Sequence, residues 1–411
     1  MTADAGTLGL RSDTTLAATR AVNGRVVGFL TFLFVIAATL ETVTWDAAGA
    51  TIRPVHVVLP ALALSIAGKT DAVSSRLMRS VAAVSLSVML LAIGPLAAHG
   101  DGSRLLFPLL LVVNLGCAAV VFAAVRNAGE PALQGVSWAL FVIMAVPVGQ
   151  TVAALFDIVP PFADARFLFT GRPPGTFEEA TWVGAMAAFA LAWAGYRRNP
   201  LLAGIALAAL VAAASRGALV GAGVTLLIVA CRGVGWSGRA VSRLVYAAVL
   251  VASVALTPVA FMLPTPAFDA TTLDSRLLDQ HAIVDMLGDD WAFGGASLLV
   301  DDAPRARVLP SSSNNVYMDF LWKQGVFGIA TLVILGWAAL RRWPRLVEAT
   351  GPMWMQPAPF LIVTISLWMC VLNNAVLRPW LWIEYGIGLA VMVMPTRSVE
   401  PRTVERGSGA R

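Results

Sequence analysis

Long apolar runs separated by short polar connections follow one another along most of the chain. A helix needs about 20 apolar residues to cross the hydrocarbon core of a bilayer, and in lipid a helix satisfies its own backbone hydrogen bonds. The pattern therefore predicts an all-α polytopic membrane protein with about 12 transmembrane helices. The predicted spans are 26–44, 54–68, 81–98, 105–125, 136–156, 179–196, 200–214, 217–231, 244–262, 324–340, 358–377 and 379–395.

The segment 263–323 interrupts this pattern, because it is too polar for lipid and too long for a simple turn. Within it, residues 274–287 place Leu277, His281 and Val284 on one helical face and aspartates on another. This spacing predicts a helix that lies on the membrane surface. The predicted organisation is an N-terminal tail (1–25), nine transmembrane helices (26–262), the large loop (263–323), three transmembrane helices (324–395) and a C-terminal tail (396–411).

The composition agrees with this picture, since 58% of the residues are hydrophobic and only 13% are charged. Such values exclude an ordinary soluble globular chain. The basic residues stand singly at the ends of apolar runs, which sets orientation in a membrane and gives no reason to expect a nucleic-acid partner.

The distribution of Lys and Arg predicts the orientation of the chain. Cytoplasmic connections are enriched in these residues, and this rule places both termini in the cytoplasm, in agreement with an even number of spans. It places the connections 157–179 and 263–323 outside, together with short turns at Ser215–Gly217 and Arg378-Pro379. The arginines expected on the outer side are Arg166, Arg172, Arg216, Arg276, Arg305, Arg307 and Arg378.

Neither a metal nor another cofactor is expected. The three cysteines lie in or beside apolar runs and form no CxxC motif, so neither a disulfide framework nor a zinc site is predicted. Asp289, Asp290, Asp301 and Asp302 lack the spacing of a calcium loop. The polar first 20 residues lack a cleavage pattern, so no cleaved signal peptide is expected.

Two arginine motifs are candidate binding sites for a phosphate group. Ser215-Arg216-Gly217 ends an apolar run. Its arginine either reaches lipid headgroups or, held between small neighbours, binds a diphosphate through its planar fork of donors. Arg166 and Arg172 lie in a Pro-rich connection, where solvated charges and substrate contacts are both open interpretations.

Polar residues before the tenth span are candidates for sugar recognition. Asn314 and Asn315, followed by Tyr317, precede a helical run that begins at Val316. One asparagine suits a helix cap, and two amides with a phenol also suit sugar hydroxyls. His281 is the one histidine in the large loop, and it is either solvated or catalytic.

The order of these motifs resembles the O-antigen ligase and O-antigen polymerase superfamily of bacterial inner-membrane glycosyltransferases, which are metal-independent and GT-C-like. The family's SR(G/A) turn matches Ser215–Gly217, and its outer loop with an arginine, an amphipathic helix and a Gly-rich turn matches Arg276 and Gly294-Gly295. Its closing segment and G-x-x-G match residues 314–318 and Gly325–Gly328. The resemblance covers residues 170–328.

The resemblance implies a reaction on the periplasmic face. An acceptor glycan hydroxyl attacks the anomeric carbon of an undecaprenyl-diphosphate-linked glycan, and the lipid diphosphate leaves. Arg216 and Arg276 would stabilise the leaving group where other enzymes use a metal. The implied substrate-binding residues are Arg166, Arg172, Ser215, Asn315, Tyr317 and Arg378. Membrane lipids and a chain-length regulator are the other expected partners.

One position departs from the family pattern. Ligases carry a histidine where this chain has Asn314, and a neutral amide cannot act as a general base. The departure favours a polymerase over a ligase that acts on lipid A-core or protein. His281 and Asp319 are the remaining candidate bases.

Two other classes of protein stay open on the sequence. A secondary transporter also combines 12 spans with cytoplasmic termini, although Glu41 and Glu384 fall near span ends and intramembrane carboxylates are otherwise scarce. A flippase for a lipid-linked precursor is the other alternative, and it requires no large outer loop.

Overall fold

The structure, a computed structural model, describes most of the predicted spans. The spans 217–231, 244–262 and 358–377 lie almost wholly outside the described residues, as does nearly all of the predicted surface helix 274–287. The described residues are 23–47, 50–68, 70–100, 102–156, 158, 172–177, 180–215, 218–219, 287, 291–295, 316–349 and 377–394.

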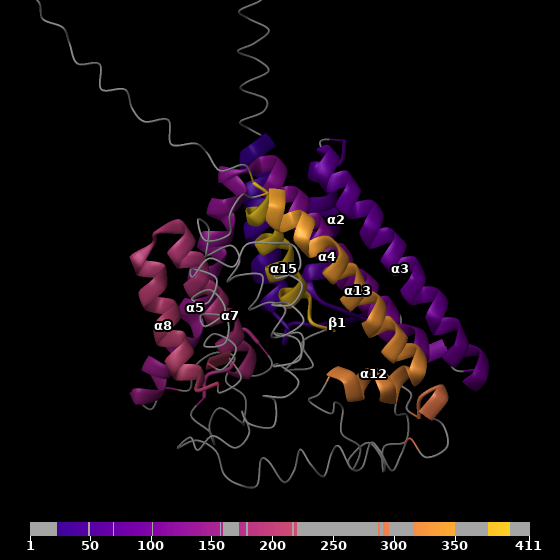
Figure 1. Ribbon diagram of the computed structural model, residues 1–411. Coiled ribbons are helices and arrows are strands. Elements are labelled where there is room, and N and C mark those ends of the chain that lie inside the picture. The colour runs from indigo at the N-terminus through magenta and orange to yellow at the C-terminus, as the bar shows by residue number, and fades with distance from the viewer. Residues whose placement is uncertain are drawn as a thin grey trace, which may run out of the picture.

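The described residues form a bundle of helices with one small pair of strands (Figure 1). The helix Asn23–Thr39, here called the N-terminal helix, comes first. The elements that follow are β1 (Trp45–Ala47), β2 (Ala50–Ile52), α2 (Pro54–Ile66), α3 (Ala72–His99), the 3-10 helix η1 (Gly102–Leu105), α4 (Leu106–Ala128), α5 (Glu130–Leu155), α7 (Ala180–Arg197), α8 (Pro200–Ala213), α12 (Val316–Gln324), α13 (Val326–Ala349) and α15 (Pro379–Val393).

The helices indicate a membrane protein. Three of the described helices, α3, α4 and α5, are long and apolar enough to cross a membrane. Large apolar side chains such as Leu64, Leu90 and Trp337 are more than half exposed on the outside of the bundle. Exposed apolar surface of this extent is typical of a protein that contacts lipid.

The strand pair is a departure from the all-α prediction. The first span was expected to extend to residue 44, but its helix ends at Thr39, and β1 pairs with β2 in antiparallel register, Trp45 opposite Ile52. Aromatic and β-branched residues favour strands, and Trp45, Thr51 and Ile52 supply them here. The fold is therefore nearly all helical, with one short hairpin after the N-terminal helix.

Several helices begin where the local sequence satisfies their free N–H groups. The Asp71 carboxylate accepts a hydrogen bond from the Ser74 N–H at 2.8 Å, so α3 begins at Ala72 and not at the predicted residue 81. The Asn199 side chain accepts from the Leu202 N–H at 3.0 Å and caps α8. Proline occupies the first turn of both α8 and α15, where its missing N–H costs nothing.

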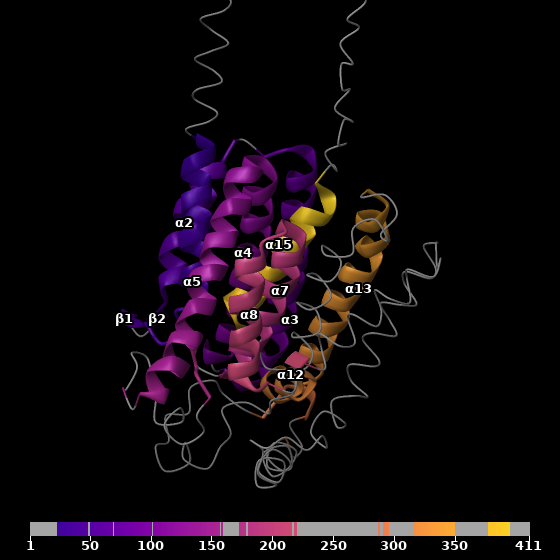
Figure 2. The ribbon, with the colours of Figure 1, turned by 90° about the vertical axis from the view of Figure 1, so that its left-hand side faces the viewer.

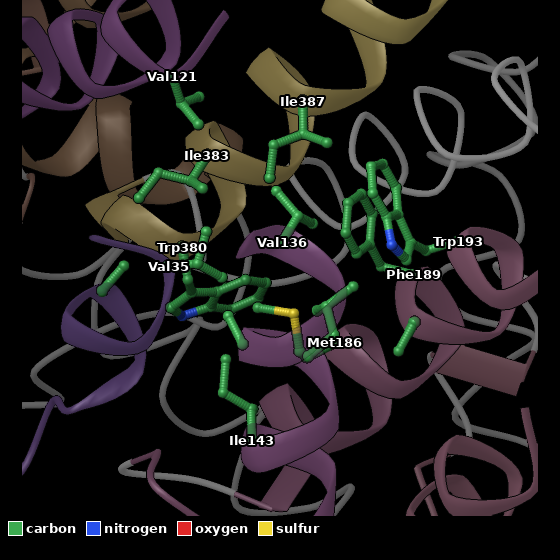
Figure 3. Close-up of a cluster of buried hydrophobic side chains, with 14 of the residues drawn as sticks. Val35, Val121, Val136, Ile143, Met186, Phe189, Trp193, Trp380, Ile383 and Ile387 are labelled. Atoms are coloured by element: carbon green, nitrogen blue, oxygen red, sulfur yellow. The ribbon is translucent and has the colours of Figure 1, made fainter. Parts of the chain in front are cut away.

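The core is built from apolar side chains of the N-terminal helix, α2, α4, α5, α7, α8 and α15, and from close contacts at small residues. α15 packs along α4, and α7 packs along the Ala-rich α8. Small residues allow helices to approach closely in this way. Figure 3 shows the side chains that meet at the centre, which include Val35, Val121, Val136, Ile143, Met186, Phe189, Trp193, Trp380, Ile383 and Ile387.

Gly386 sets the close approach of α15 to α4, which yields a first prediction. A Cβ at this position would lie 2.6 Å from a Val121 methyl group and would collide with the Ala118 backbone. We expect Gly386→Ala to lower the unfolding free energy by about 1–3 kcal/mol because the interface is overpacked. The matched control is Gly116→Ala in α4, since a Cβ there meets nothing within 4 Å. The measurement is thermal unfolding in detergent. Equal changes in the unfolding temperature for both variants would contradict this role of Gly386.

Ion pairs among the described residues lie at two opposite ends of the bundle. At one end, here called the Arg126 end, the Arg126 guanidinium pairs with Asp71 at 2.5 Å and donates to the Val393 carbonyl at 2.6 Å. Arg197 pairs with Glu130 at this same end. The other end, here called the Arg378 end, holds the starts of α4, α7 and α15 and the ends of the N-terminal helix and α8, and α12 lies there in both views (Figures 1 and 2).

Candidate functional site

Arg378 is at the centre of the candidate site. It is the N-cap residue of α15, and its side chain is mostly buried. One guanidinium nitrogen lies 3.5 Å from the Glu41 carboxylate, which is 1% exposed. The guanidinium carbon also lies 4.2 Å from the centre of the Trp182 ring, a cation–π contact that holds the planar group against α7.

Lys323 brings a second buried cation to Arg378. It lies in α12 and is only 7% exposed. Its amine lies 5.4 Å from the centre of the Phe107 ring of α4 and 5.9 Å from that of Trp322. Burial lowers the pKa of the Lys323 amine, the Asp319 carboxylate raises it in part, and Arg378 lowers it further. The two cations are thus close enough to repel one another.

Asp319 balances part of this positive charge. It is fully buried and stands one helical turn before Lys323 on α12. Together with the Glu41–Arg378 pair it forms a cluster of two cations and two carboxylates, which we call the charged cluster (Glu41, Asp319, Lys323 and Arg378). Charges are costly to bury unless they are paired, so a cluster of this kind in a membrane protein indicates a function.

Buried N–H donors accompany the charged cluster. Within the described part of the chain, the indole N–H groups of Trp182, Trp322 and Trp380 have no hydrogen-bond acceptor, and neither does the Gln324 side-chain amide nitrogen. All four residues are almost fully buried. Buried donors are normally satisfied, so these groups suit a ligand that is rich in oxygen acceptors.

Arg172 and Ser215 form a second group at the same end. Arg172 begins a segment, 172–177, that is fixed to α5 by two hydrogen bonds between the Gln150 side chain and the Gly175 backbone. The Arg172 Nε–H donates to the Ala213 carbonyl at 2.8 Å, at the last turn of α8. The Ser215 hydroxyl accepts from the Ala218 N–H at 3.4 Å. The end of α8 is thereby held against the segment 172–177.

Glycines hold α12 in its place at the end of the bundle. The helical run from Val316 was expected to enter the tenth span directly, but α12 stops at Gly325, which has a φ of +60°. Gly294, with a φ of +84°, packs against the end of α12, and the Gly295 N–H donates to the Trp322 carbonyl at 3.0 Å. The predicted Gly-rich turn therefore positions α12, and with it Lys323 and Asp319.

The structure places some of the predicted site residues and leaves others untested. Asp319 and Arg378 lie in the charged cluster, and Arg172 and Ser215 lie in the second group. Tyr317 lies in α12, of which only the backbone is described at that position. The predicted residues outside the described part are Arg166, Arg216, Arg276, His281, Asn314 and Asn315.

Sequence reasoning did not select Lys323, Trp182 or Glu41 as site residues. Lys323 carries a signal that is readable in the sequence, since the chain has only two lysines and this one stands at the edge of an apolar run. Glu41 and Trp182 carry none, because their roles depend on contacts with Arg378, far along the chain. Among the described residues, no three His, Cys, Asp or Glu side chains lie together as a metal site.

No protein-family model and no curated protein matches the chain. The family resemblance stays a prediction that rests on the motifs named above.

Proposed function

We propose that the chain is a bacterial inner-membrane glycosyltransferase whose donor is a glycan linked to undecaprenyl diphosphate. It would polymerise repeat units of an O-antigen or exopolysaccharide on the periplasmic face of the membrane. The observation that carries the proposal is the buried pair of basic side chains, Arg378 and Lys323, at one end of a bundle of apolar helices.

A diphosphate is the ligand class that this end of the bundle fits best. Its oxygens accept several hydrogen bonds and carry negative charge, and a guanidinium binds two of them at once. Arg378 presents that group, and the ring of Trp182 lies against it. Within the described part of the chain the Trp182 indole N–H has no acceptor. Aromatic rings beside such donors also suit the faces of sugars.

The separation of charge between the two ends supports the proposed orientation. Arg126 and Arg197, expected in the cytoplasm, lie at one end, and Arg172 and Arg378, expected outside, lie at the other. We therefore propose that the Arg378 end faces the periplasm and receives the loop 263–323, within a bundle of 12 spans with cytoplasmic termini.

The residues at the Arg378 end could assist the transfer of a glycan from the lipid diphosphate to the acceptor. As the acceptor oxygen bonds to the anomeric carbon, the bond to the diphosphate breaks and negative charge grows on the leaving oxygen. Arg378 would stabilise that charge in a site that excludes water, where electrostatic stabilisation is strongest. Arg216, which follows Ser215 directly in the chain, and Arg276 are the further arginines implied by the resemblance.

Proton-coupled transport is a second candidate, and Glu384 is the observation that favours it. This residue lies within α15, is 1% exposed, and neither carboxylate oxygen has a hydrogen-bond partner among the described residues. Ionisable residues buried in a membrane helix often carry protons in transporters. A transferase gives Glu384 no role in chemistry, so we expect Glu384→Gln to retain transfer and to abolish any uptake activity.

Arginine variants in cells test the proposed function. In a strain that lacks the gene, the parent chain is expected to restore long-chain polysaccharide, whereas Arg216→Ala and Arg276→Ala are expected to restore none, because the leaving diphosphate is no longer stabilised. The measurement is the chain-length ladder on a gel, with the amount of protein in the membrane as its control. Arg126→Ala, at the opposite end of the bundle, is the matched control, and it is expected to give the parent's chain-length ladder. Normal ladders for both outer variants would overturn the assignment.

A further inference from the structure

A glycosyl transfer needs a group that accepts the proton of the attacking hydroxyl, and the sequence leaves this group unassigned. Asn314 stands where ligases have a histidine, and an amide is not a base at neutral pH. Asp319, one helical turn before Lys323, acts on the Lys323 amine as a counter-charge.

The surroundings of Lys323 make its amine easier to deprotonate than the amine of a solvated lysine. The side chain is almost fully buried, and the aromatic rings of Phe107 and Trp322 lie within 6 Å of the nitrogen. Removing an ammonium group from water is expensive, and Lys, unlike Arg, gives up its proton readily when buried. α12 ends one residue later, at Gln324, so the amine belongs to the end of the bundle and not to the interior of a membrane span.

Two charged groups among the described residues act on this amine. Asp319, on its own helix, favours the ammonium form, and Arg378, at the start of α15, opposes it. From α4 the amine meets Phe107, which is uncharged. Burial and Arg378 outweigh Asp319, so the pKa of Lys323 lies below its ordinary value. Since the neutral fraction rises as the pH increases through this lowered value, a base at this position works nearer neutral pH than a solvated lysine does.

We propose that Lys323 is the general base of the transfer reaction, an inference that rests on the proposed function. The acceptor oxygen forms its bond to the anomeric carbon, and its proton moves to the Lys323 nitrogen. The electron pair of the broken C–O bond leaves with the diphosphate. The new ammonium group then lies in the same cluster as the newly charged leaving group, and the two charges stabilise one another.

Lysine variants distinguish a base from a simple positive charge. The probe is the undecaprenyl-diphosphate-linked repeat unit from a strain that lacks this gene, and the readout is the rate of transfer at saturating donor against pH. Lys323→Met and Lys323→Arg are both expected to lower kcat by about 10²–10⁴-fold, the range for loss of a general base. The affinity of Lys323→Arg for the lipid-linked donor is expected to stay within a few fold of the parent's affinity. Thermal unfolding of Lys323→Met identifies a variant that fails to fold.

Chemical rescue distinguishes a base from a residue that only supports the structure, because only a base sets the pH dependence of the transfer rate. In a background where Cys117, Cys231 and Cys370 are replaced by alanine, Lys323→Cys is treated with 2-bromoethylamine, which builds a lysine analogue whose amine is less basic. The analogue is expected to restore activity and to move the acidic limb of the pH profile to lower pH. An active Lys323→Arg variant, or an acidic limb that does not move, would overturn the assignment of the base. A parent protein without transfer activity would overturn the proposed function, and the base with it.

Discussion

Replacing Arg378 with alanine is expected to lower the transfer rate by about 10²–10³-fold, the range for loss of one donor that stabilises a developing negative charge. The guanidinium is fixed from two sides, by Glu41 at 3.5 Å and by the Trp182 ring at 4.2 Å. Arg378→Lys keeps the charge but not the planar fork, so we expect it to recover only part of the lost rate. The measurement is the initial rate with purified protein and lipid-linked donor.

A loss of activity in Arg378→Ala must be distinguished from a loss of stability. Arg378→Ala leaves the Glu41 carboxylate buried without its cation, and breaking a buried pair costs about 3–5 kcal/mol. The double variant Glu41→Gln/Arg378→Met removes both charges, so it is expected to recover much of the unfolding free energy while remaining inactive. An active double variant would show that the guanidinium has no role in transfer.

Gly325→Ala is expected to lower both the unfolding free energy and the transfer rate. Gly325 has a φ of +60°, and a Cβ there would lie 2.6 Å from the Phe293 backbone nitrogen. A non-glycine residue in this conformation costs about 1–3 kcal/mol, and the collision with the backbone of 292–293 adds to that cost. α12 would have to shift away from Gly294, and Lys323 would move with it.

The matched control is Gly336→Ala in the middle of α13, because a Cβ there meets nothing within 4 Å. This replacement is expected to be neutral or to stabilise the helix by up to about 1 kcal/mol. Thermal unfolding and transfer rate are measured for both variants. If Gly325→Ala keeps the parent's rate, the position of α12 does not matter for the reaction.

Much of the helical framework could be predicted from the sequence because its signals are local. Apolar runs predicted where most of the described helices lie, and the bounds of α2 and α8 differ from the predicted ones by only a few residues. The start of α3 was missed although Asp71 is a recognisable cap, since hydropathy alone marked the span. The break at Gly325 was missed because a glycine between apolar residues also suits an unbroken helix.

The charged cluster could be predicted only in part. Arg378 was selected because it lies in a predicted outer turn, and Asp319 because it is a candidate base near the position where the family has a histidine. Their partners Glu41 and Lys323 come from other helices, and the periodicity of one helix carries no information about which charge of another helix it meets. Burial is likewise a property of the assembled bundle.

The most direct test of the account uses purified protein in proteoliposomes supplied with undecaprenyl-diphosphate-linked repeat units. The account predicts that the glycan grows by whole repeat units and that one undecaprenyl diphosphate is released for each unit added. It predicts that Arg378→Ala lowers the rate of both by about 10²–10³-fold. Unchanged donor, together with movement of a solute or of the lipid-linked glycan across the bilayer, would contradict it and would favour a transporter or a flippase.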